Sequence, residues 1–334
     1  MELSAMDYVN LGKSGVKVSR ICLGTAFRAN LFKADFNEAD CIRIIEHGLA
    51  CGINFIDTAN FYSYGRSEVV VGKAIRHKRD DVVLATKVRS QVNDNPGPND
   101  SGLSRYHIMR EVERSLRRLQ TDHIDLYLLH AMDDGTPIEE TLRAMDDLVR
   151  QGKVRSIGCC NFSAWRLCEA LWRSDVLNLN AFACIQNQYS LLNRWEIEPD
   201  LAPLCQNHGL GITVYSPLAI GLLTGRFRAG QPPPAGTPWA DSPHHRSHFD
   251  TMMNDKSDRI VQALIDVGHA HGKTPSQVAI AWLLDHPEVA SVIIGPDSPG
   301  HIDDALGAAG WQLAHEERAM LDALSQVDEP LKMA

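Results

Sequence analysis

The 334-residue sequence is poor in features that mark several classes of protein. Aromatic residues make up only 7% of it, and no block of lysine and arginine offers a basic surface for a nucleic-acid backbone. Acidic residues outnumber basic ones by 42 to 33, which gives a net charge of −9. No basic leader precedes an apolar stretch, and the longest near-apolar run, 124–132, contains an aspartate and a histidine. We therefore expect a cytoplasmic protein that binds neither nucleic acid nor membrane, and the sequence does not indicate its oligomeric state.

Cysteine usage argues against disulfides and metal ligation. The eight cysteines form no CxxC pair and lack the spacing of a disulfide framework, and several lie in apolar segments, which favours reduced thiols. Cys159 and Cys160 are adjacent on an expected strand, so they point to opposite faces and favour packing over a disulfide. His244, His245 and His248 cluster, but no further ligands accompany them, and we expect no metal site.

Eight short runs rich in Val, Ile and Leu recur along the chain: VSRICLG, INFID, VVLATKV, IDLYLLH, VRSIGCC, FACIQNQ, LGITVYS and VASVIIG. The first six intervals between them average about 32 residues, a period typical of repeated strand-plus-helix units. Amphipathic segments at 37–51, 104–119 and 138–151 predict helices, the first two with Asn37 and Ser104 as N-caps. Within the second, Glu111 is expected in solvent.

Parallel strands alternating with helices predict an α/β fold, a (β/α)₈ TIM barrel that forms one domain over 1–334. An open doubly wound sheet is the alternative, but the turn LGTAF after the first run lacks GxGxxG. Two segments lie outside the eight units. YVNLGKSGVKVS predicts a hairpin that plugs the barrel floor, and 227–257, rich in Pro, Gly and His, predicts a long loop after strand 7.

Three consecutive expected strands end in ionisable side chains: a carboxylate, an ammonium and an imidazole. Asp57 ends INFID, Lys87 ends VVLATK and His130 ends IDLYLLH, while Tyr62 follows five residues after Asp57. In a barrel these side chains meet at the active face. Asp57 would keep a buried Lys87 charged, and an adjacent ammonium lowers the pKa of a tyrosine hydroxyl such as that of Tyr62, so that it can exchange protons. None of the four supplies a hydride, which implies a cofactor. Nucleophilic catalysis by Lys87 through a Schiff base is an alternative.

At this point the sequence resembles the aldo-keto reductases. The resemblance lies in GINFIDTANFYSYGRSEVVVGKAI, VVLATKV, DHIDLYLLH, GKVRSIGCCNF, QNQYSLLNR, GITVYSPLAIGLLTGRF and SVIIGPDSP. It implies an NAD(P)-dependent oxidoreductase that interconverts a carbonyl (aldehyde, ketone or sugar) and an alcohol, with Asp57, Tyr62, Lys87 and His130 as a catalytic tetrad and Tyr62 as general acid and base. A cofactor-binding regulatory subunit with weak turnover, as in relatives associated with ion channels, is the alternative.

The same resemblance implies a set of cofactor contacts. Asn161 and Gln186 would hold the nicotinamide carboxamide, Tyr215 would stack on its ring, and the segment after Tyr215 would follow the pyrophosphate. The full set is Gly24, Thr25, Asp57, Cys160, Asn161, Gln186, Tyr215, Ser216, Pro217, Leu218, Gly221, Leu223, Arg226, Gly295, Asp297, Ser298, His301 and Asp304.

The adenosine end departs from the family's pattern. Related sequences commonly carry a basic residue toward the 2′-phosphate of NADP(H), where this chain has Asp297. A carboxylate repels a phosphate but accepts hydrogen bonds from a ribose hydroxyl, so the expected NADP(H) preference is weakened and NAD(H) is a serious alternative. The other interpretation is that Asp297 faces solvent while His301 or Arg226 meets the phosphate.

Candidates for the substrate mouth are five aromatic residues and one methionine: Phe27, Phe32, Phe61, Tyr64, Met132 and Trp239. Such walls suit sugars, aryl aldehydes and terpenoid or steroid ketones alike. Part of this set is also compatible with ordinary loop packing.

Overall fold

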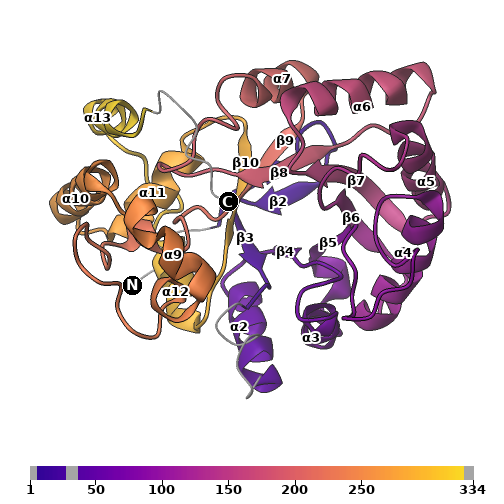
Figure 1. The fold of residues 1–334 in the computed structure, drawn as a ribbon, viewed down its shortest axis with the longest axis horizontal. Coiled ribbons are helices and arrows are strands. Elements are labelled where there is room, and N and C mark those ends of the chain that lie inside the picture. The colour runs from indigo at the N-terminus through magenta and orange to yellow at the C-terminus, as the bar shows by residue number, and fades with distance from the viewer. Residues whose placement is uncertain (1–5, 28–36, 327–334) are drawn as a thin grey trace.

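A computed structural model describes residues 6–27 and 37–326. Its centre is a closed barrel of parallel strands in the order β10-β3-β4-β5-β6-β7-β8-β9 (Figure 1). The barrel strands are β3 (Ile21–Gly24), β4 (Phe55–Asp57), β5 (Val83–Val88), β6 (Ile124–Leu129), β7 (Val154–Cys160), β8 (Cys184–Gln188), β9 (Gly211–Tyr215) and β10 (Val289–Ile294). The predicted TIM barrel is confirmed.

Helices surround the barrel, and their ends follow the predicted caps. Asn37 accepts backbone hydrogen bonds at the start of α2, and Ser104 accepts one from His107 at the start of α4. The surrounding helices are α2 (Glu38–Ala50), α3 (Arg66–Ile75), α4 (Arg105–Leu119), α5 (Ile138–Arg150), α6 (Ala164–Val176), α7 (Leu201–His208), α10 (Asp255–His271), α11 (Pro275–Leu284), α12 (Pro299–Leu306) and α13 (His315–Ser325). In the described part of the chain, none of the helices is long and apolar enough to span a membrane.

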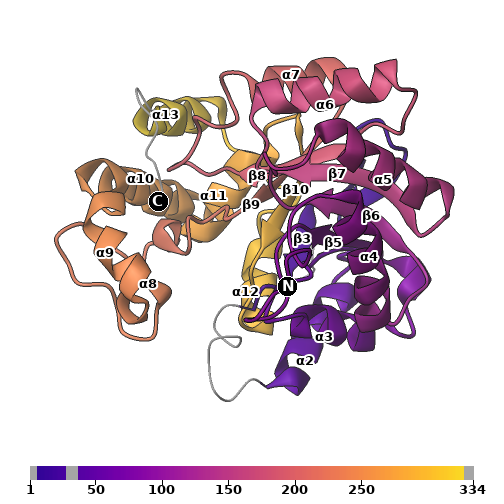
Figure 2. The same ribbon diagram turned by 45° about the vertical axis from the view of Figure 1, so that its right-hand side comes forward.

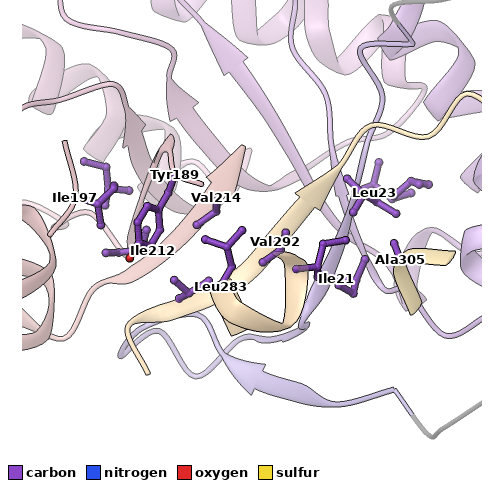
Figure 3. Close-up of a cluster of buried hydrophobic side chains, with 14 of the residues drawn as sticks. Ile21, Leu23, Tyr189, Ile197, Ile212, Val214, Leu283, Val292 and Ala305 are labelled. Carbon is purple, nitrogen blue, oxygen red and sulfur yellow. The ribbon is translucent and has the colours of Figure 1, made fainter. Parts of the chain in front are cut away.

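Strand residues alternate between two hydrophobic cores. One core fills the space between barrel and helices, where Val214 and Val292 lie with Leu283 of α11 (Figure 3). The other fills the barrel interior. Cys159 belongs to the outer core and Cys160 to the inner one, so the neighbouring thiols point to opposite faces as expected.

The N-terminal hairpin closes the barrel floor. Strands β1 (Tyr8–Asn10) and β2 (Lys17–Ser19) pair antiparallel, and Leu11 and Val18 join the core inside the barrel. Gly12, at φ +57°, lies so close to the starts of β8 and β9 that a Cβ atom there would meet the Ala183 carbonyl oxygen at 2.6 Å. The hairpin prediction is confirmed, and its turn needs this glycine for both reasons.

The long segment after β9 is more ordered than predicted. After a 3-10 turn, η2 (Leu222–Thr224), it forms two short helices, α8 (Pro238–Asp241) and α9 (Pro243–Met252). They lie together beside α10, across the barrel from α4 and α5 (Figures 1 and 2). Of the prolines that indicated a loop, Pro238 and Pro243 occupy first helical turns, where the missing N–H costs nothing, and Ser242 caps α9. The other three, at 232–234, lie in the loop before α8.

Between α3 and α4, the expectation of a solvated Glu111 is wrong. Its side chain is 0% exposed, as is that of Glu68 on α3, and the guanidinium of Arg118 binds both carboxylates at 2.6 Å. The shared arginine makes burial of two acidic groups tolerable, because each keeps an opposite charge and a hydrogen bond.

Candidate active site

The C-terminal ends of neighbouring strands bring the four predicted groups together. Asp57 is the last residue of β4, Lys87 lies near the end of β5, and His130 directly follows β6. Tyr62 stands in the turn between β4 and α3, where its backbone N–H donates to the Ala59 carbonyl. Lys87 Nζ lies 5.1 Å from the centroid of the Tyr62 ring, and the rings of Tyr62 and His130 are 6.0 Å apart.

A buried ion pair forms the base of this group. Lys87 is fully buried, and its Nζ donates to Asp57 Oδ2 at 2.7 Å and to the Thr58 carbonyl at 2.8 Å. The second Asp57 oxygen accepts from Gln186 Nε2 at 2.9 Å. Thr25, which directly follows the neighbouring strand β3, holds the end of β4, since its N–H and hydroxyl both donate to the Asp57 carbonyl. The lysine is therefore fixed in position by groups from several elements.

Lys87 stays protonated in this setting. Burial acts against its charge, but the carboxylate of Asp57 outweighs that effect and raises the pKa of Lys87 above its ordinary value. A Schiff-base nucleophile needs a neutral amine, so this environment disfavours the nucleophilic role considered for Lys87.

Tyr62 departs from the sequence-based expectation. Its pKa is raised from the ordinary value, because burial outweighs the Lys87 ammonium, which lowers it. The expected net lowering of this pKa is therefore wrong in direction. The lysine keeps the pKa of Tyr62 lower than burial alone would leave it, and Tyr62 remains a hydroxyl, and thus a proton donor, at neutral pH.

His130 is held neutral. Burial, together with the positive charges of Lys87 and Arg89, lowers its pKa well below the ordinary value. Its Nδ1 is buried and has no hydrogen-bond partner among the described residues. Arg89, two residues beyond Lys87, also donates to the Met132 carbonyl at 2.7 Å. Sequence reasoning missed this arginine, although the spacing KVR at the strand end was visible.

Beside the tetrad, β7 and β9 present the groups expected to face a nicotinamide. Asn161, at φ +58°, donates from Nδ2 to the His130 carbonyl and accepts at Oδ1 from the Tyr215 hydroxyl, at 2.9 and 2.8 Å. Its N–H donates to Asn187 Oδ1 at 2.9 Å, a contact that sequence reasoning also missed. Cys160, 1% exposed, lies beneath them in the barrel interior.

The backbone after β9 forms a cradle of unusual conformation. Ser216, Ala219 and Ile220 have φ values of +53°, +48° and +56°, followed by Gly221 at +88°. A non-glycine residue in this left-handed backbone conformation is strained by on the order of 1 kcal/mol, and such strained residues are frequent at ligand sites. Successive turns of this kind point backbone N–H groups to one side, which suits a pyrophosphate.

The remaining residues of this segment divide between core and surface. Pro217 is buried and Leu223 is 0% exposed, so Leu223 has only backbone to offer a ligand. Leu218 is partly exposed, and Arg226 is exposed. Two strands along the barrel, at the end of β3, a Cβ atom on Gly24 would meet the Ile294 carbonyl oxygen at 2.8 Å, so β10 can approach only a glycine here.

Comparison with known proteins identifies this architecture. The sequence model described as "Aldo/keto reductase family" matches residues 20–326. The chain belongs to this family. Aldo-keto reductases are NAD(P)-dependent oxidoreductases, and a barrel with a buried Lys-Asp pair beside a tyrosine is compatible with that chemistry.

Several relatives match this aldo-keto reductase over most of its length. It is 37% identical to an uncharacterized oxidoreductase, YrpG, from Bacillus subtilis, with 95% of each chain covered. Identity is also 37% to a probable voltage-gated potassium channel subunit beta from Arabidopsis thaliana, over 91% of each chain. Versiconal hemiacetal acetate reductase from Aspergillus parasiticus is 33% identical, over 95% of this chain and 96% of the relative.

The adenosine-side candidates of the reductase lie around the start of α12. Asp297 is exposed, and its backbone N–H donates to His301 Nδ1 at 3.2 Å. Ser298 is the N-cap residue, and Gly295 has open space where a Cβ would be. Asp304 instead accepts at Oδ1 from the Thr274 hydroxyl at 2.8 Å, so its carboxylate joins α12 to the start of α11.

Two of the substrate candidates lie beside the rings of Tyr62 and His130. The Phe61 ring, on a residue 38% exposed, lies 5.1 Å from the rings of both Tyr62 and His130. Met132 is partly exposed two residues after His130. Tyr64 is farther into solvent, with 63% exposure.

Other substrate candidates lie elsewhere. Phe27 and Trp239 are both 2% exposed. The indole N–H of Trp239 donates to the Ile220 carbonyl at 3.0 Å, and its ring packs against Phe249. Trp239 therefore packs α8 and α9 against the cradle and does not reach over an open mouth as expected. Phe32 lies outside the described residues.

Proposed function

We propose that this protein interconverts a small carbonyl compound and its alcohol, with Tyr62 as the general acid and base. The observation that carries the proposal is the fully buried Lys87 ammonium, fixed by Asp57 and Thr58 and lying 5.1 Å from the Tyr62 ring. A buried charge carries a desolvation cost even when it is paired, so its presence here favours a functional role, and we propose that this role is to stabilise a phenolate.

In reduction, the Tyr62 hydroxyl donates its proton to the carbonyl oxygen while Lys87 stabilises the phenolate that remains. Neutral His130 forms a hydrogen bond with the same oxygen and orients it toward Tyr62. A bound nicotinamide supplies the hydride. In oxidation the phenolate takes the proton from the alcohol.

The residues around this group suit a nicotinamide nucleotide. Asn161 and Gln186 offer amides to the carboxamide, Tyr215 offers a ring for stacking, and the 216–225 cradle offers N–H groups to the pyrophosphate. In this proposal Gln186 donates a hydrogen bond from Nε2 to Asp57, and its side-chain oxygen accepts one from the ligand.

We further propose that NAD(H) competes with or replaces NADP(H). Asp297 is exposed beside the N-terminus of α12, where a 2′-phosphate would meet its carboxylate. Arg226 is also exposed, and its positive charge could offset that repulsion. Repulsion by the Asp297 carboxylate would lower affinity for the phosphorylated cofactor.

Phe61 is our strongest candidate for a substrate wall, because its ring contacts both Tyr62 and His130. An aromatic wall beside two polar groups suits the hydrophobic side of an aryl aldehyde, a ketone or a sugar ring.

The test is a screen of aldehydes, ketones, sugars and alcohols with NAD(H) and NADP(H) in parallel, at two pH values. We expect cofactor-dependent turnover and an NADP(H) preference, in kcat/KM, below about a hundredfold. A larger preference would overturn the NAD(H) proposal. For the charge-reversal variant Asp297→Arg, the matched control is Asp122→Arg, at a residue 95% exposed just before β6, at the other end of the barrel.

A regulatory role is the second candidate, favoured by similarity to proteins named as potassium channel beta subunits. It predicts tight cofactor binding with slow oxidation of the bound, reduced cofactor by every carbonyl compound in the screen. Loss of nicotinamide fluorescence over many turnovers would instead support the enzyme.

A further inference from the structure

A second cluster of reactive side chains lies outside the barrel, between α2 and α12. His47 lies in the last turn of α2, and Cys51, four residues later, is the C-cap residue on the same side of the helix; Asp303 faces them from α12. One atom from each residue can be chosen so that all three lie within 4.8 Å of one another. The two helices are neighbours in the fold (Figure 1).

The packing of α2 against α12 fixes this arrangement. Gly48, next to His47, is buried, and a Cβ atom at this position would lie 3.6 Å from Ile302 and 3.2 Å from Leu23. Ile302, the neighbour of Asp303, is itself 0% exposed. His47 and Asp303 therefore adjoin residues that pack in the core between α2, α12 and β3.

The distance between the sulfur and nitrogen ligands matches that around a tetrahedral metal ion, and the nitrogen–oxygen distance is shorter. His47 Nε2 lies 3.6 Å from Cys51 Sγ and 2.7 Å from Asp303 Oδ1. Zinc bond lengths of about 2.0–2.1 Å to nitrogen, 2.3 Å to sulfur and 2.1 Å to oxygen place N and S about 3.6 Å apart and N and O about 3.4 Å apart. The N–O distance must therefore lengthen by about 0.7 Å on these bond lengths. The Asp303 side chain is 51% exposed, so it has room to move.

The same distances argue against a catalytic Cys-His-Asp relay. In a relay the thiol and the carboxylate bind opposite ring nitrogens, so that a proton can pass through the ring. Here both face Nε2 of His47. Convergence on one nitrogen is the pattern expected where a single cation replaces a shared proton.

We propose that His47, Cys51 and Asp303 bind a divalent transition-metal ion of the zinc class, with a fourth position open to solvent. On binding, the Cys51 thiol loses its proton to the buffer, the thiolate and carboxylate neutralise the two positive charges, and neutral His47 donates its Nε2 lone pair. Nitrogen and sulfur ligands favour zinc, cobalt(II) or cadmium over magnesium and calcium.

The site is expected to stabilise the fold, not to drive the reaction. Cys51 directly follows α2 and precedes β4, so it lies toward the floor of the barrel, away from the strand ends that carry Tyr62 and Lys87. An ion that binds only the folded chain raises its stability in proportion to the logarithm of its concentration above the Kd. The proposal therefore stands or falls independently of the proposed function.

The experiment is a titration of the metal-free full chain with cobalt(II), followed by absorbance, and a thermal melt with and without zinc. We compare the wild type with Cys51→Ser and Asp303→Asn. Cys168→Ser is the matched control, since Cys168 is an exposed thiol on α6. A His244→Ala/His248→Ala variant controls for the histidines of α9, whose rings lie 5.0 Å apart.

We expect one equivalent of cobalt to give a thiolate charge-transfer band in the wild type and in both controls, no band in Cys51→Ser, and at least about tenfold weaker binding in Asp303→Asn. Zinc should raise the melting temperature of the wild type and of both controls, but not of Cys51→Ser. A band that survives Cys51→Ser, or that disappears in Cys168→Ser, would overturn the proposal, as would the absence of any band in the wild type. Metal-free melting temperatures show whether each variant is folded.

Discussion

Replacing Lys87 with methionine tests the electrostatic basis of the proposed chemistry. The change keeps most of the side-chain volume and removes the charge that lies 5.1 Å from the Tyr62 ring. At an effective dielectric constant of about 20, a unit charge at this distance is worth about 3 kcal/mol to a phenolate. That energy corresponds to roughly a two-hundredfold change in the fraction of Tyr62 ionised at a given pH.

The assay is kcat/KM for alcohol oxidation as a function of pH. Because the pKa of Tyr62 is raised, the wild-type rate should still be rising in the alkaline range, and Lys87→Met should lie roughly two hundredfold below it at each pH on that limb. If Lys87→Met lowered kcat/KM by less than about fivefold and left the alkaline rise of the pH profile at the same pH, the role given to Lys87 would be refuted.

The same variant needs a stability control, because it leaves the Asp57 carboxylate, 3% exposed, without its cation. Breaking a buried pair costs about 3–5 kcal/mol, and adding Asp57→Asn to Lys87→Met should recover part of that loss in urea unfolding. Lys73→Met, on the surface of α3 where Lys73 binds Glu38, should change neither stability nor rate appreciably.

Three further predictions concern pH, cofactor choice and stability. His130 has a pKa well below its ordinary value and stays neutral, so kcat/KM for reduction should show no step between about pH 6 and 8; an inflection near 6.5 would contradict this. Asp297→Arg should raise the ratio of NADP(H) to NAD(H) kcat/KM by about ten- to hundredfold through one charge-assisted hydrogen bond, and an unchanged ratio would remove Asp297 from the cofactor site. Arg118→Met should lower the free energy of unfolding by about 3–5 kcal/mol, because it leaves the buried Glu68 and Glu111 uncompensated; a loss under about 1 kcal/mol in urea would contradict that account.

The sequence was sufficient for the barrel because its signals are local. Apolar runs at a steady period specify the strands, and Asn37 and Ser104 mark helix starts through contacts only two or three residues away. The convergence of Asp57, Lys87 and His130 also followed, since strand C-termini in a barrel meet on one face.

Features that depend on packing between distant segments could not be predicted. Burial of Glu111 depends on Arg118 and on a partner carboxylate in another helix. The direction of the pKa shift of Tyr62 depends on how far the side chain is removed from water, and the spacing of residues in the sequence does not reveal this. His47 and Asp303 are separated by 256 residues, so no sequence motif could join them, and their proximity is visible only in the fold.

The central claim is that Tyr62 transfers the proton, and Tyr62→Phe tests it most directly. The measurement is the single-turnover rate of oxidation of bound reduced cofactor by a carbonyl substrate, together with the cofactor Kd. Tyr106→Phe, at a residue 61% exposed on α4, is the control. We predict a loss of about 10²- to 10⁴-fold in rate, an unchanged Kd and a control that matches the wild type. A Tyr62→Phe rate within about threefold of the wild type would contradict the mechanism.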